Sequence, residues 1–163
     1  MFGKKSNEDN HDHTHDNDHA HTHAHNLELD QAQEQVKDVF RNIPLEVPLI
    51  LFAAPGKNDV FSDANRQLIR AFRELSPKID LKEFGLNHEE AQKRDIEYSP
   101  TLLIDPDNFN IRWYGAPLGE EARTFTEAIM MIGYGETNLG SEGGKILKRI
   151  EGKRDVKVFV SPT

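Results

Sequence analysis

The sequence predicts an α/β domain, a three-layer α/β/α sandwich around a mixed sheet, that follows a disordered histidine-rich tail. Composition changes abruptly near Leu27, from polar residues to periodic apolar ones. After that point, short apolar runs of strand length alternate with longer segments that have helical periodicity. The chain of 163 residues is also long enough to bury a core without disulfides. We therefore expect a tail over residues 1–26 and one folded domain over 27–163.

The tail holds seven of the eight histidines, spaced among aspartate, asparagine, threonine and alanine. Its only apolar side chains larger than alanine are Met1 and Phe2. Such a segment buries too little surface to offset the entropy lost on ordering, so we expect it to be disordered. The seven histidines are His11, His13, His15, His19, His21, His23 and His25.

The first half of the domain reads as helix, strand, helix and strand. The apolar spacing of residues 28–42 predicts a helix that ends before Pro44. VPLILFAA, residues 47–54, is a run typical of a strand buried on both faces. A helix follows, capped by Asn58 or Asp59 and reaching about Ser76, and residues 79–84 form the next strand. The apolar face predicted for this helix consists of Phe61, Leu68, Phe72 and Leu75.

The second half predicts a hairpin followed by two helices and a last strand. A short polar helix covers about 87–95, with His88 as a solvated residue at its start. The turn Pro106-Asp107-Asn108 joins two antiparallel strands, of which the second carries the core or edge aromatics Trp113 and Tyr114. The remaining elements, in order, are strands 101–104 and 110–114, helices 120–132 and 141–150, and an alternating strand 156–160.

Charge and composition exclude several classes of function. With 28 acidic against 20 basic side chains, the net charge of −8 argues against nucleic acid or an anionic membrane as the main partner. The chain has no cysteine, which excludes a thiol nucleophile, a disulfide, a cysteine-ligated zinc and an iron–sulfur cluster. No run approaches membrane-spanning length, and no apolar segment follows Lys4 and Lys5 as in a secretory signal. We therefore expect a cytoplasmic protein.

The tail histidines are candidate metal ligands. Imidazole suits nickel, zinc, copper and cobalt, and His-x-His spacing in a flexible chain lets several rings meet one ion. The interleaved aspartates add oxygen ligands and negative charge. Because nothing holds the ligand geometry, the site would be adaptable and weakly selective, with Ni²⁺ or Zn²⁺ as the expected ions and no tightly bound cofactor. The alternative is a solubilising tail whose metal affinity has no physiological role.

Several segments in the same order carry a resemblance to a known family. They are VPLILFAA, the helix from Asp59, YSPTLLI, IRWYGAPLGEE, GETNLG and VKVFVSPT, which cover most of residues 44–163. In this order they resemble the thioredoxin-like fold, and in particular the first unit of the tandem, glutaredoxin-like protein disulfide oxidoreductases. The N-terminal part of the flavoprotein component of alkyl hydroperoxide reductase is similar. The resemblance implies a thioredoxin-like sandwich and a site at the start of the helix.

The chain departs from that family where the family performs its chemistry. The resemblance places Asp59-Val60-Phe61-Ser62 at the Cys-x-x-Cys positions, and neither aspartate nor serine can exchange a disulfide. The plain interpretation is that Asp59 caps the helix and Ser62 is an ordinary first-turn residue. An active site rebuilt for other chemistry would need a general base or a metal nearby, and the sequence indicates neither. We therefore expect no thiol–disulfide oxidoreductase activity.

The resemblance also implies a cis peptide bond before Pro100. That proline would border a peptide-binding groove formed by Asp59, Phe61, Ser99 and Pro100 beside the former Cys-x-x-Cys. The groove could survive without its chemistry, and the backbone of Ser99 could pair with an extended segment of a partner. Alternatively, the cis proline is kept only because the fold requires it.

Two classes of function follow, with a third alternative. In the family a strand like VKVFVSPT opens the second, catalytic unit, and this sequence ends at Thr163, where those cysteines would begin. The first class is a redox-inactive binding module, an adapter or accessory subunit with a protein partner and a metal-binding tail. The second is the non-catalytic N-terminal unit of a disulfide oxidoreductase system whose Cys-x-x-Cys unit is elsewhere. The third is a stand-alone nickel or zinc buffer.

Overall fold

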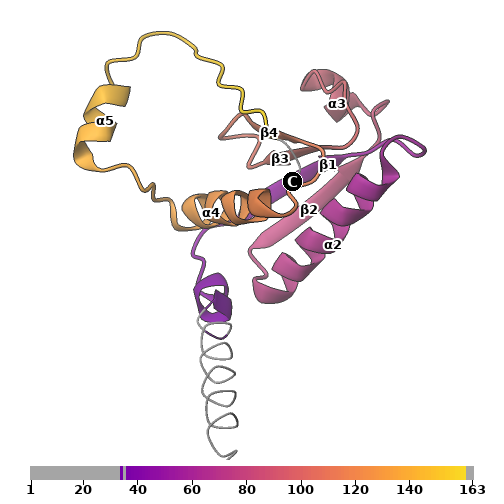
Figure 1. Cartoon of the computed structure of the whole chain (residues 1–163), viewed down its shortest axis with the longest axis horizontal. Coiled ribbons are helices and arrows are strands. Elements are labelled where there is room, and N and C mark those ends of the chain that lie inside the picture. Colours follow the sequence, from indigo (N-terminus) through magenta and orange to yellow (C-terminus); the bar gives the residue numbers. More distant parts are fainter. Residues whose placement is uncertain (1–33, 35, 161–163) are drawn as a thin grey trace, which may run out of the picture. The chain divides into compact units, whose positions relative to one another are not determined.

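The computed structural model describes residue 34 and residues 36–160 (Figure 1). The seven tail histidines, the boundary expected at Leu27 and most of the helix predicted over 28–42 lie outside the described residues. Residues 36–41 are helical, as the end of that predicted helix requires, and the helix ends before Pro44. Residues 38–163 form a compact unit of the chain.

A mixed sheet of four strands organises this unit, in the order β2-β1-β3-β4. β1 pairs in parallel with β2, with Val47 opposite Ile79, and antiparallel with β3. β3 and β4 form the expected hairpin, with Thr101 opposite Tyr114. The strands are β1 (Val47–Phe52), β2 (Ile79–Phe84), β3 (Thr101–Ile104) and β4 (Ile111–Tyr114).

Apolar residues cover both faces of the central strands, which explains why β1 and β3 lack polar alternation. Alternate residues of β1 point to opposite faces, so Leu49 and Leu51 join one cluster while Ile50 and Phe52 join another. The larger cluster packs against α2 (Asp59–Leu75) and α4 (Glu120–Tyr134), and the smaller one against α3 (Glu89–Lys93). Figure 1 shows these helices around the sheet, and the three-layer α/β prediction is confirmed.

The inward face of α2 differs from the predicted one. Its buried residues are Ser62, Asn65, Ile69 and Phe72. The predicted Leu68 and Leu75 lie only partly buried at the margin of the core, and Phe61 is 44% exposed. Sequence reasoning followed the large apolar side chains, whereas the helix rotates so that two small polar residues of its first turns face inward. The prediction that Phe61 packs in the core is therefore wrong.

The C-terminal segment also departs from the expectation. α5 spans Ser141–Leu147, shorter than the predicted 141–150, and buries none of its residues. Residues 151–160 belong to no strand, so the prediction of a strand over 156–160 is wrong for the single chain. Val156, Val158 and Phe159 are 85%, 80% and 90% exposed. The alternation is present in the sequence, but within the described chain no strand pairs with the segment.

His88 and Arg94 hold α3 in place. His88 caps the helix, because its Nδ1 accepts a hydrogen bond from the backbone of Glu90 at 3.2 Å, and its ring stacks on Phe84. The helix-start role predicted for His88 is thus confirmed. Arg94 donates to Glu90 at 3.1 Å and to Asp107 at 2.7 Å, which ties α3 to the β3–β4 turn. Hydrogen bonds from Arg94 hold the pKa of Glu90 and that of Asp107 below their usual range.

Arg94→Met should lower the free energy of unfolding modestly at pH 7. It should also make that free energy fall less as the pH is lowered. Carboxyls whose pKa is depressed in the folded state stabilise the fold above their unfolded pKa of about 4. That contribution disappears as the pH falls through the folded pKa. Urea unfolding of both proteins at pH 7 and at about pH 3 tests this: the deficit of the variant should shrink in acid. An equal deficit at both pH values would contradict the ion-pair account.

None of the described helices is both long and apolar enough to cross a bilayer.

Candidate functional site

The loop between β1 and α2 brings the predicted site residues together. Asn58 adopts the left-handed conformation, with φ of 56°, and Asp59 is the first residue of α2. Both carboxylate oxygens of Asp59 accept from the backbone N–H of Gly56 at 3.0 Å. The Asn58 side chain makes no cap hydrogen bond to the helix. Asn58 thus occupies the N-cap position, as one of the two predicted alternatives, but its side chain does not cap the helix because its amide is used elsewhere, and the carboxylate of Asp59 closes the preceding loop instead.

The Asn58 amide instead reaches the loop before β3. Its Nδ2 donates to the carbonyl oxygen of Ser99 at 2.8 Å, and the Ser99–Pro100 peptide bond is cis, as expected. The Ser99 hydroxyl accepts from the backbone N–H of Ala54 at 2.8 Å. Two side-chain hydrogen bonds therefore fasten the proline loop to the loop between β1 and α2. Ser99, next to Pro100, thus contacts Asn58, the neighbour of Asp59, and the peptide-binding groove stays a prediction.

These bonds change what Ser99 offers to a partner. The groove hypothesis relies on its backbone, and its carbonyl already accepts the Asn58 amide. A carbonyl oxygen has two lone pairs, so one remains for a second donor. An extended segment docking here would have to share that oxygen with Asn58 or displace its amide.

Two polar side chains are buried beneath the first turns of α2. Ser62 is 1% exposed, and its hydroxyl finds no hydrogen-bond partner among the described residues. Asn65 is fully buried, and its Nδ2 donates to the carbonyls of Phe61 at 2.9 Å and Gly115 at 2.8 Å. Asn65 thereby ties α2 to the loop that follows β4. Sequence reasoning missed Asn65, although its position three residues after Ser62 on an amphipathic helix was a usable signal.

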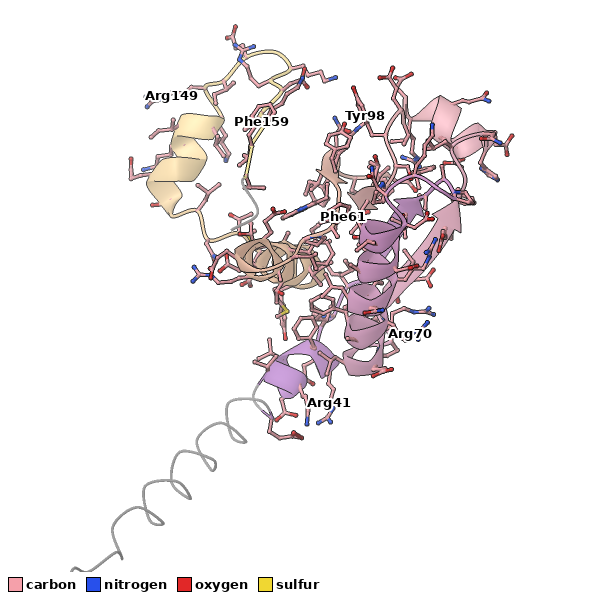
Figure 2. All side chains as sticks on the ribbon, turned by 45° about the vertical axis from the view of Figure 1, so that its right-hand side comes forward. Arg41, Phe61, Arg70, Tyr98, Arg149 and Phe159 are labelled. Atoms are coloured by element: carbon pink, nitrogen blue, oxygen red, sulfur yellow. The ribbon has the colours of Figure 1, made fainter. Side chains whose placement is uncertain are left out.

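Three exposed aromatic side chains surround this point and form what we call the aromatic patch: Phe61, Tyr98 and Tyr114. Their exposed fractions are 44%, 63% and 57%. The Tyr98 and Tyr114 rings meet edge to face, with centroids 5.6 Å apart. Phe61 belongs with them because Asn65 binds the carbonyls of Phe61 and of Gly115, the residue after Tyr114. Figure 2 labels Phe61 near the start of α2 and Tyr98 in the loop above it.

Trp113 points into the protein, as predicted for a core aromatic. Its ring packs edge to face on Phe125 at 5.6 Å, and its Nε1 donates to Glu121 at 2.9 Å. Tyr114, the next residue, lies on the exposed side of the edge strand β4. The two neighbours thus serve the core and the surface respectively.

The chemistry available at this site is limited by its side chains. Asp59 supplies an exposed carboxylate and Ser62 a buried hydroxyl, and the chain has no cysteine with which to exchange a disulfide. Within residues 34 and 36–160, no three histidine, cysteine or acidic side chains gather as a metal site. The arrangement can therefore present backbone groups and aromatic surface to another chain.

Comparisons with known proteins support the fold. No family model and no curated protein matches the chain. A protein disulfide oxidoreductase from Aeropyrum pernix is 22% identical with a TM-score of 0.62, and the match covers 76% of this chain and 55% of that one. A mutant of the alkylhydroperoxide reductase AhpF from Enterococcus faecalis is 22% identical with a TM-score of 0.57, covering 69% and 56%. The NTD_N/C domain of AhpF from the same organism is 24% identical, with a TM-score of 0.56 and coverage of 69% and 56%.

The chain therefore has a thioredoxin-like fold, similar to that of disulfide oxidoreductases and of AhpF, as its ordered motifs predict. It spans little more than half of the length of these solved structures. The absence of cysteine agrees with a lost Cys-x-x-Cys at the start of α2.

Proposed function

We propose that this chain is a redox-inactive, thioredoxin-like binding module, an adapter or accessory subunit that holds a protein partner against the aromatic patch in the cytoplasm. The observation that carries the proposal is the contrast at the start of α2. Hydrogen bonds from Asn58 and Ala54 to Ser99 hold the cis-proline loop against the loop that precedes α2, while the chain has no cysteine for redox chemistry. Three exposed aromatic rings beside these loops offer the apolar contact area that protein interfaces favour.

The test compares matched aromatic variants in partner capture. The full chain serves as bait in extract of the source cells, with a chelator present to suppress metal-mediated contacts. Phe61→Ala with Tyr98→Ala should release a stoichiometric partner that the unchanged chain retains. Phe109→Ala is the matched control, because Phe109 is equally exposed, at 47%, but lies in the β3–β4 turn. A partner retained equally by all variants, or no partner at all, would overturn the adapter proposal.

A second candidate is the non-catalytic N-terminal unit of a thiol–disulfide oxidoreductase system. The relative lengths of the two chains favour this candidate, because this chain covers only 55% of a similar disulfide oxidoreductase. Reading the coding sequence beyond Thr163 for Cys-x-x-Cys distinguishes the two. A continuous second unit with that motif would assign the chain to this system, and its absence would leave the separate adapter.

We further propose that the tail binds Ni²⁺ or Zn²⁺ through its seven histidines, with the stand-alone metal buffer as the alternative role. Calorimetric titration of the full chain with each metal should give binding that is lost when His11, His13, His15, His19, His21, His23 and His25 are changed to alanine. His88→Ala is the control and should leave binding unchanged, because His88 caps α3. Equal metal uptake after the tail substitutions would exclude the tail as the site.

A further inference from the structure

An extended, apolar segment at the C-terminal side of α5 has no partner strand within the described chain. Val156, Val158, Phe159 and Val160 are 85%, 80%, 90% and 55% exposed. Apolar and other residues alternate at Val156, Lys157 and Val158, as in a strand with one face buried. Exposed apolar residues in this density mark an interaction site. Residues 156–160 thus have the sequence pattern of a β-strand, but no strand of the described chain pairs with them.

One edge of the sheet, formed by β4, has unpaired backbone groups that a further strand could bond. β4 pairs with β3 on one side, and no strand of the described chain pairs with its other side. The opposite edge strand, β2, carries the charged residues Asp80, Lys82 and Glu83 along six residues, which protects an edge against strand addition. β4, with the sequence Ile-Arg-Trp-Tyr, carries one charged side chain, that of Arg112. Between the two edges, β4 is the one open to a further strand.

Charge points to another copy of this chain as the source of that strand. Residues 141–160 hold six basic and three acidic side chains, whereas the preceding 140 residues hold 14 basic and 25 acidic ones. Acidic residues also flank β4: Glu121 binds Trp113, and Glu97 precedes Tyr98, whose ring contacts Tyr114. The basic segment is thus complementary in charge to the acidic remainder of the chain, and every copy carries both.

We propose that residues 156–160 of one copy add to the free edge of β4 in a second copy, so that the protein self-associates by strand addition. Backbone hydrogen bonds would supply the pairing and alternate side chains its register. Ile111 and Trp113 belong to the core face of β4, so the three valines fit beside them. Phe159 would then lie on the other face with Tyr114 and Tyr98. This inference goes beyond the adapter proposal and does not depend on it.

Sedimentation equilibrium of the full chain, with a chelator present and concentrations up to about 1 mM, should show a reversible increase of mass above the monomer. Val158→Asp should weaken the association by about tenfold or more, because it places a charge in the paired segment. Leu147→Asp is the matched control, since Leu147 is an equally apolar, 50% exposed residue of α5. It should change the association less than about twofold. A monomer throughout, or equal effects of the two substitutions, would overturn the proposal.

A second measurement identifies the acceptor edge. Because the chain has no native cysteine, Lys157→Cys accepts a single spin label. Labelled protein is mixed with an ¹⁵N-labelled, unsubstituted copy, so that any broadening of amide signals is intermolecular. Residues 111–114 should broaden most. Broadening of the amide signals of β2, or no broadening at β4 in a sample that self-associates, would overturn the assignment of β4 as the acceptor edge. Val158 lies outside the aromatic patch, so the mass of the Val158→Asp variant tests self-association separately from the capture of a different protein by the patch.

Discussion

Asn65→Asp should destabilise the domain by about 3–5 kcal/mol at pH 7, the largest stability effect expected of a conservative change in this chain. Asn65 is fully buried, and its amide donates to the carbonyls of Phe61 and Gly115. A carboxylate would face the same two oxygens with no hydrogen to donate and with a charge removed from water. The start of α2 and the loop after β4 would lose their tie at the place where the aromatic patch is assembled.

The pH dependence separates this account from a simple packing defect. Burial and the two carbonyls raise the folded-state pKa of the introduced carboxyl above its unfolded value of about 3.9. A group with a raised folded pKa stabilises the fold below its unfolded pKa and loses that contribution as the pH rises through the folded pKa. Urea unfolding between about pH 4 and 8 should therefore show a deficit that grows with pH. Asn65→Leu should show a constant deficit, and parallel behaviour of the two variants would contradict the hydrogen-bond role.

Restoring two cysteines should restore disulfide chemistry. Asp59→Cys with Ser62→Cys should catalyse reduction of insulin disulfides by dithiothreitol on the order of tenfold faster than either single variant. The unchanged chain should not exceed the uncatalysed rate. Asp59 is the first residue of α2, so a thiolate at position 59 would lie at the N-terminus of the helix, where the helix dipole lowers the pKa of a thiol. Position 62 is buried and its hydroxyl lacks a described partner, so a less polar thiol is tolerated there.

The single variants are the necessary controls, because one thiol cannot close an intramolecular disulfide. Positions three apart in a helix also lie within the distance range that a disulfide spans. Thermal unfolding of each variant establishes that the proteins compared are folded. A folded double variant that matches the single variants in rate would show that positions 59 and 62 do not reproduce the geometry of the lost motif.

Much of the fold was predictable because the strands and the longer helices are encoded locally. VPLILFAA contains only apolar residues, so β1 could only be a buried central strand, and the Pro106-Asp107-Asn108 turn indicated the β3–β4 hairpin. The cis Ser99–Pro100 bond was predicted correctly, and Asn58, next to Asp59, bonds to Ser99. The expectation that these two loops meet depended on resemblance, because residues so far apart in the chain carry no local signal of contact.

The predictions that were wrong concern elements whose structure depends on contacts with residues distant in the sequence. The rotation of α2 is set by Asn65, whose partner Gly115 lies 50 residues away, and this tie outweighs the burial of Phe61. The alternation of residues 156–160 is a genuine strand pattern, but a strand exists only when another strand supplies its hydrogen bonds. The described chain supplies none to this segment.

By itself, the sequence determined the class of the sheet, the position of its central strands, the lack of thiol chemistry in this chain and the polar character of the tail. These follow from composition and short-range periodicity, which are properties of neighbouring residues. Only the tertiary structure decided that Asn58 bonds to Ser99, that Asn65 is buried, and that the aromatic patch lies beside the cis proline. Each of these is a choice among partners distant in the chain, and packing the helices on the sheet is what brings those partners within hydrogen-bond reach.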